Sequence, residues 1–214
     1  MKARRNMSKI VTKNAAIITA MGLGAYAGVQ GLVQAVVELC RGDAVNGFLI
    51  HAVGAPCTPD GVWHACMPAV TLLPTMMITG IAAGLVGLAT VAWALFFVHR
   101  RRGGLVLIGL SVLLLLAGGG FTGPFVGLLG GLSALLAGRK AASDGGRSFP
   151  AGWWPWPLVI LLTTYPFGFL LGYLFPALAL DLRVLIIGVF DGLLPILTVW
   201  TGLAKGRMIS GYRL

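Results

Sequence analysis

Long apolar stretches alternate with short polar segments along this chain of 214 residues. The apolar stretches run over residues 15–37, 69–98, 105–117, 124–137, 156–175 and 184–204. Four of them are long enough to cross about 30 Å of hydrocarbon as helices, which rise about 1.5 Å per residue. The pattern predicts one all-α domain over residues 1–214, an integral membrane helical bundle with six transmembrane spans.

The third and fourth stretches are too short to cross a bilayer by themselves. As helices, residues 105–117 and 124–137 would extend only about 20 Å and 21 Å. The segment GGGFTGP between them, at residues 118–124, is a strong helix breaker, and Pro124 suits a first helical position. One continuous helix would need about 50 Å and would place its basic flanks on opposite sides. The two stretches are therefore predicted to form a short, glycine-broken hairpin.

Basic residues fall into clusters that the six-span topology places on one side of the membrane. Fourteen of the sixteen Lys and Arg residues belong to them, namely Lys2, Arg4, Arg5, Lys9 and Lys13, then Arg100, Arg101 and Arg102, then Arg139, Lys140 and Arg147, and last Lys205, Arg207 and Arg213. Because basic residues at span ends stay in the cytoplasm, both termini are predicted to be cytoplasmic. The outer loop then covers about residues 39–68 and a cytoplasmic loop covers about 138–155. A bacterial or archaeal plasma membrane is the expected location.

Composition agrees with this class of protein. Hydrophobic residues make up 57% of the chain and charged residues 10%, whereas a soluble domain carries roughly 25% charge. The net charge of +10 is explained by residues beside span ends, where they meet anionic lipid headgroups. Membrane lipids are therefore expected partners, and nucleic acid is not.

The N-terminus permits a second interpretation. A basic segment, an apolar run and the triplet Ala25-Tyr26-Ala27 resemble a cleavable signal peptide. The run stays apolar through Val37, which is longer than a typical signal core, so an uncleaved first span is the better interpretation.

Glycine pairs four residues apart recur in the apolar stretches, for example Gly24/Gly28 and Gly80/Gly84. Such faces let helix backbones approach closely. Packing within the chain is the simpler interpretation, and a seam for a membrane-protein partner or a second copy of the chain is the alternative.

Two polar stripes lie in the predicted outer half of the bundle. The first comprises Tyr26, Gln30, Gln34 and Glu38, and the second comprises Thr71, Thr75 and Thr79. The members of each stripe are four residues apart, so they share one face of a helix. Polar side chains in lipid need partners, which favours the two stripes facing each other. They either hydrogen-bond across a packed interface or line an outward-facing polar cleft.

Asp191 is the only acidic residue well inside a predicted span. A carboxylate at that depth is costly unless it is protonated, paired or hydrated, and such residues are commonly functional. Its possible partners are Tyr165, Thr164 and the glutamines of the first span. Asp191 is either an ionic site or a protonated acid that joins two helices by a hydrogen bond.

The outer loop contains Cys57, Cys66, His51 and His64. On an oxidising side of the membrane, Cys57 and Cys66 are predicted to form a disulfide. A metal site from these four residues is the alternative, but their spacing matches no standard zinc signature, so no metal is expected. Cys40 is left over near the outer end of the first span.

No nucleotide-binding or catalytic signature is found in the sequence, and no cofactor is implied. Three functions stay open. The first, which the lack of a catalytic set favours, is a non-enzymatic accessory or structural subunit that packs with partner membrane proteins. The second is a translocator of a small solute or ion that uses the buried aspartate and the polar cleft. The third is an intramembrane enzyme acting on a lipid or a quinone.

Overall fold

The computed structural model describes residues 15–40, 42, 49–52, 68–137, 149–164 and 188–211. This part of the chain is mostly helical, which confirms the predicted helical class. The main helices are α2 (Ala15–Leu39), α3 (Met76–Phe96), α4 (Gly103–Leu116), α5 (Thr122–Ala137) and α8 (Leu194–Gly211), with a further helix over residues 156–164. Strands β1 (Leu49–Ala52) and β2 (Pro68–Thr71) form an antiparallel pair, and a π-helical turn covers Gly188–Leu193.

Within the described residues, two helices are long and apolar enough to cross a membrane, namely α2 with 25 residues and α3 with 21. Helices α4 and α5 are also apolar but have only 14 and 16 residues. Residues 165–187, which contain most of the predicted fifth span and the start of the sixth, lie outside the described part. The count of six spans and the membrane crossing of the hairpin therefore stay predictions.

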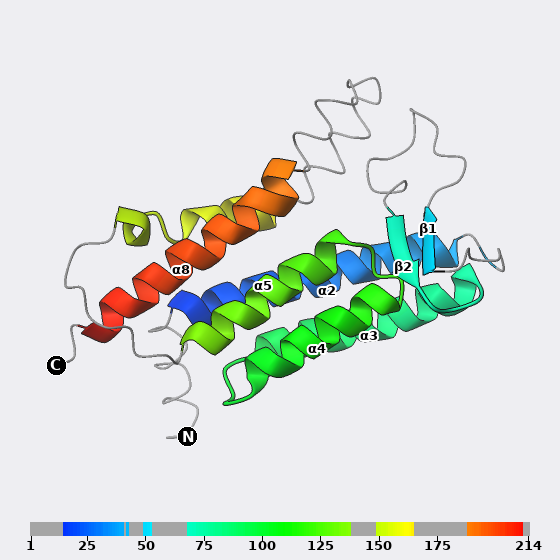
Figure 1. Cartoon of the computed structure of the whole chain (residues 1–214), viewed down its shortest axis with the longest axis horizontal. Coiled ribbons are helices and arrows are strands. Elements are labelled where there is room, and N and C mark those ends of the chain that lie inside the picture. The colour runs from blue at the N-terminus through cyan, green and yellow to red at the C-terminus, as the bar shows by residue number, and fades with distance from the viewer. Residues whose placement is uncertain are drawn as a thin grey trace.

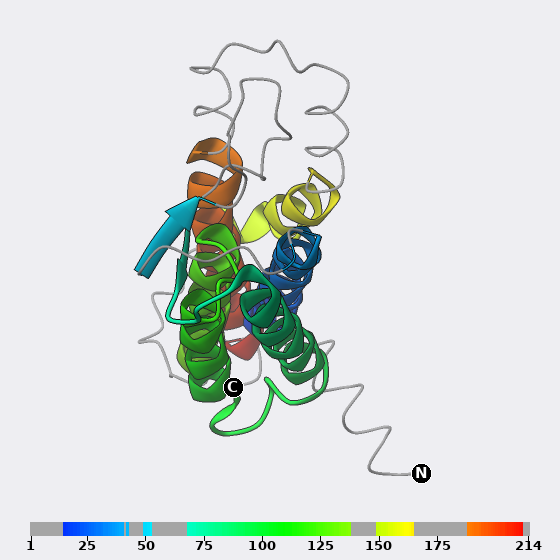
Figure 2. The same cartoon turned by 90° about the vertical axis from the view of Figure 1, so that its right-hand side faces the viewer.

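Helix α2 lies at the centre of the bundle and packs against α3, α5 and α8 (Figures 1 and 2). These three helices run antiparallel to α2, since earlier residues of α2 meet later residues of each: Gly24 meets Ala94, Leu23 meets Gly130 and Thr19 meets Gly202. The start of α2, the turn from α3 to α4 and the end of α8 gather at one end of the bundle, opposite the β-strands (Figure 1). Two of the predicted basic clusters have residues in the described part of the chain. Both lie toward this end of the bundle, namely Arg100–Arg102 and the pair Lys205 and Arg207.

Glycines allow the closest helix contacts. A Cβ added to Gly28 would lie 2.6 Å from the Gly87 carbonyl oxygen, and one added to Gly87 would lie 2.9 Å from the Gly28 carbonyl oxygen. Helices α2 and α3 can cross at this distance only because neither residue has a side chain. Gly109 of α4 differs, since a Cβ there would meet nothing within 4 Å.

Gly28→Ala is expected to lower the free energy of unfolding by about 1 to 3 kcal/mol, the usual cost of overpacking a tight contact. Gly109→Ala is the matched control, because it makes the same chemical change in an open helical position. It should leave stability unchanged or raise it by up to about 1 kcal/mol, the difference in helix propensity. Unfolding by SDS in mixed micelles measures both values. Equal stability of the two variants would contradict the close crossing.

Helix α3 begins later than the sequence pattern predicts. The second apolar stretch starts at residue 69, but residues 68–71 form β2 and the helix starts at Met76. Pro74 disfavours helical backbone at the preceding residue. Thr75 then caps the helix, since its hydroxyl accepts a hydrogen bond from the Ile78 N–H at 3.4 Å.

The sixth predicted helix also differs from the prediction in its start and its end. A π-helical turn precedes α8, and α8 continues to Gly211 rather than ending near residue 204. Pro195, in the first turn of α8, has no N–H to donate to the carbonyl of Asp191. Regular α-helical bonding is therefore interrupted at the aspartate.

Helix α4 ends in a Schellman motif at the glycine break. The Gly119 N–H donates to the Leu114 carbonyl at 2.8 Å, and the Gly118 N–H donates to the Leu115 carbonyl at 3.3 Å. Gly118 has a φ of 89°, a left-handed conformation that favours glycine. Gly120 also has positive φ, at 74°, and α5 begins two residues later.

Candidate functional site

The polar residues predicted on α2 form one buried row. Tyr26, Gln30, Gln34 and Glu38 are exposed by only 5%, 9%, 7% and 0%. Their spacing places them on one face, over about 18 Å of helix axis. The described residues close over these side chains, so the row lies within packed protein. The outward-facing cleft stays a prediction.

At the end nearer the start of α2, the row reaches Asp191. The Tyr26 hydroxyl donates to Asp191 Oδ1 at 3.3 Å, and Gln30 Nε2 donates to the Tyr26 hydroxyl at 2.9 Å. The Thr122 side chain also lies beside the Asp191 carboxyl. Three segments distant in sequence, α2, the start of α5 and the π-helical turn, thus meet at one carboxyl group. Single π-helical turns occur often at functional sites.

The partners of Asp191 differ from those expected. A glutamine of the first span reaches the carboxyl only through Tyr26. Thr164 donates to carbonyls of its own helix, at Ile160 and Leu161, and Tyr165 lies outside the described residues. Tyr26 was predicted as a member of the polar stripe on the first span. The position of Thr122 beside Asp191 was not predicted, because no pattern in the sequence indicates it.

At the end nearer Leu39, the row packs against the glycine break. A Cβ added to Gly118 would lie 3.1 Å from Glu38 Oε1, and one added to Gly120 would lie 3.9 Å from the Gln34 amide oxygen. Within the described part of the chain, Gln34 Nε2 is buried with no hydrogen-bond partner. The break therefore borders both side chains, and a Cβ at Gly118 would crowd Glu38 whereas one at Gly120 would only touch Gln34.

The three threonines do not form one helical stripe. Thr71 lies in β2, Thr75 caps α3, and only Thr79 lies within the helix. Thr71 and Thr79 still meet, with their hydroxyl oxygens 3.3 Å apart, and Thr79 donates to the Thr75 carbonyl at 2.9 Å. The Thr79 methyl group and the Glu38 carboxylate both adjoin Gly118. The α2 row and two of the threonines thus border the same turn.

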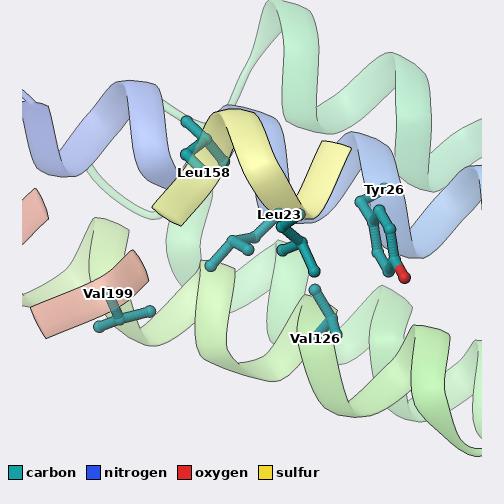
Figure 3. Close-up of a cluster of buried hydrophobic side chains, with 6 residues drawn as sticks. Leu23, Tyr26, Val126, Leu158 and Val199 are labelled. Carbon is teal, nitrogen blue, oxygen red and sulfur yellow. The ribbon is translucent and has the colours of Figure 1, made fainter. Parts of the chain in front are cut away.

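An apolar cluster packs beside the Tyr26 end of the row. It consists of Leu23, Tyr26, Val126, Leu158, Leu161 and Val199. Figure 3 shows Tyr26 at the margin of this cluster, with its hydroxyl pointing away from Leu23. The ring of Tyr26 therefore belongs to the apolar cluster, while its hydroxyl belongs to the polar row.

The predicted outer-loop site cannot be placed. Cys57, Cys66 and His64 lie outside the described residues, and His51 is placed only by its backbone in β1. Cys40 is exposed, with a free thiol. No group of three or more His, Cys, Asp and Glu side chains suited to a metal ion occurs among the described residues. The disulfide stays a prediction.

No family model matches this chain, and neither curated proteins nor solved structures show a significant similarity to it.

Proposed function

We propose that this chain is a polytopic membrane protein that moves a small cation or polar solute through a site at Asp191. The observation that carries this proposal is the contact between Tyr26 and Asp191. It lies where a buried polar row from the outer end of α2 meets an apolar cluster on the inner side. A row of polar side chains that leads in from one side and an apolar cluster toward the other are features expected of a translocator in a closed state.

The depth of this contact supports the proposal. Tyr26 lies about 17 Å along the axis from Ala15 and about 20 Å from Leu39, so it is near the middle of a helix long enough to span the membrane. Transporter sites lie near the bilayer midplane, often where a helix is interrupted. The π-helical turn at Asp191 is such an interruption.

The chemistry of the site favours a cation. A carboxylate binds a proton or a small cation, and the hydroxyls of Tyr26 and Thr122 can reorient around it. Transfer toward the cytoplasm requires the cluster around Leu23 to separate, because its apolar side chains offer the solute no ligand.

Liposomes that contain only this chain test the proposal. A gradient of H⁺, Na⁺ or K⁺ is imposed, and uptake is followed with an indicator inside the vesicles. Uptake above that of empty liposomes for at least one ion is the expected result. Absence of flux for these ions and for small polar solutes would favour the accessory subunit instead.

The accessory-subunit proposal has its own support in the exposed apolar face of α3. This face includes Ile81, Leu85, Leu88 and Phe96, which lipid or a partner helix would cover. Purification in mild detergent separates the possibilities. A stoichiometric partner protein favours an accessory subunit, whereas a bound quinone or lipid substrate favours the enzyme alternative.

We also propose six spans, with both termini in the cytoplasm of a bacterial or archaeal cell. This orientation is supported by Arg100–Arg102, Lys205 and Arg207, which all lie toward one end of the bundle. Single cysteines are introduced at Ser143 and at Gly61, in a chain lacking its three native cysteines. An impermeant thiol reagent is expected to label only position 61 in intact cells. Labelling of position 143 alone would reverse the orientation.

A further inference from the structure

The turn between α3 and α4 carries two exposed arginines and is held in place by side-chain contacts. The Trp93 indole N–H donates to the Gly103 carbonyl at 3.0 Å, which ties the end of α3 to the start of α4. The Arg100 guanidinium lies over the Phe97 ring, 4.6 Å from its centroid. Arg101 and Arg102 follow in the same turn and are exposed.

This turn carries positive charge without a nearby carboxylate in the described part of the chain. The acidic residues described are Glu38, near the end of α2, and Asp191, beside Tyr26. Both are remote from the turn, which adjoins the start of α2 (Figure 1). Guanidinium groups bind phosphate oxygens in a two-pronged geometry, so Arg101 and Arg102 are complementary to a phosphate group.

An apolar stripe begins one turn beyond Arg102. Leu105, Val112, Leu113 and Leu116 of α4 are exposed, and Gly109 leaves an open notch among them. From Leu105 to Leu116 the stripe extends about 17 Å, close to half of the roughly 30 Å hydrocarbon thickness. Its length therefore fits one acyl chain of a single leaflet.

We propose that this surface binds an anionic phospholipid of the cytoplasmic leaflet. Its phosphate lies against Arg101 and Arg102, and an acyl chain lies along the exposed stripe of α4. The charge selects an anionic headgroup, and the adjoining stripe selects a lipid over a soluble phosphate. This site requires the membrane placement proposed above but does not depend on transport.

Binding of phosphatidylglycerol to the purified, full-length protein in neutral detergent tests this proposal. Native mass spectrometry gives the fraction of protein with bound lipid at each lipid concentration. Arg101→Gln together with Arg102→Gln is expected to weaken binding about thirtyfold, because each basic residue near an anionic lipid contributes a factor of about five. Arg100 is kept because it packs on Phe97.

The control removes the same charge at the same end of the bundle. Lys205→Gln together with Arg207→Gln should change phosphatidylglycerol binding by less than about threefold if the turn is the site. An equal loss in both double variants would overturn the proposal, since it would indicate a general charge effect. Equal binding of phosphatidylcholine, or equally tight binding of glycerol phosphate, would also overturn it.

These outcomes are separate from the tests of the membrane placement and of transport. Reversed cysteine labelling would place the arginines in the other leaflet, yet the detergent measurement would still report whether the turn binds the lipid. Absence of ion flux would leave the lipid result unchanged.

Discussion

Asp191→Asn is expected to fold like the wild-type protein and to abolish ion flux in liposomes. Asparagine has nearly the shape of aspartate and keeps an oxygen that can accept the hydrogen bond from Tyr26. It cannot carry a negative charge or exchange a proton. A carboxyl group that binds the transported cation therefore loses its function in this variant, while the helix contacts remain.

Asp191→Leu separates the ionic role from a structural one. Leucine removes both the charge and the hydrogen bond from Tyr26. We expect a loss of stability of about 0.6 to 2 kcal/mol, the range for hydrogen bonds between membrane helices. Detergent unfolding measures stability, and liposome uptake measures transport. Wild-type uptake by the Asn variant would overturn the ionic role. Wild-type uptake and stability of both variants would show that Asp191 is not part of a functional site.

Gly118→Ala is expected to lower the free energy of unfolding by about 3 kcal/mol. A residue with a Cβ at a φ of 89° costs about 1 to 2 kcal/mol. The new Cβ would also overlap the Thr79 Cγ2 methyl group and approach Glu38 Oε1 to 3.1 Å. Overpacking of this kind adds about 1 to 3 kcal/mol. SDS unfolding in mixed micelles measures the change.

Two further variants separate the backbone cost from the steric cost. Gly120→Ala has a similar φ of 74°, but its Cβ would come no closer than 3.9 Å to the Gln34 amide, so it should show only the backbone cost. Thr79→Ser removes the obstructing methyl group and keeps the hydroxyl that donates to the Thr75 carbonyl. Combined with Gly118→Ala, it should restore part of the lost stability. Equal losses for Gly118→Ala and Gly120→Ala would contradict the packing at the break.

Sequence reasoning located the elements that depend on local pattern. Helices α4 and α5 begin within two residues of the predicted third and fourth stretches, because apolar runs and the glycine break act within a few residues. The predicted start of the second span was wrong. The apolar run includes β2, and hydrophobicity alone does not distinguish a strand from a helix. Pro74 was the signal that could have corrected this start.

The four-residue spacing on α2 also determined that Tyr26, Gln30, Gln34 and Glu38 share one face, because helix geometry depends only on separation along the chain. Tertiary structure decided what that face meets. Tyr26 and Asp191 are 165 residues apart, and the packing of α8 against α2 brings them together. The glycine break lies against Gln34 and Glu38 because α5 packs against both α2 and α4, which holds the turn between α4 and α5 next to α2. Contacts between distant segments depend on how whole helices fit together, and no local pattern in the chain encodes that fit.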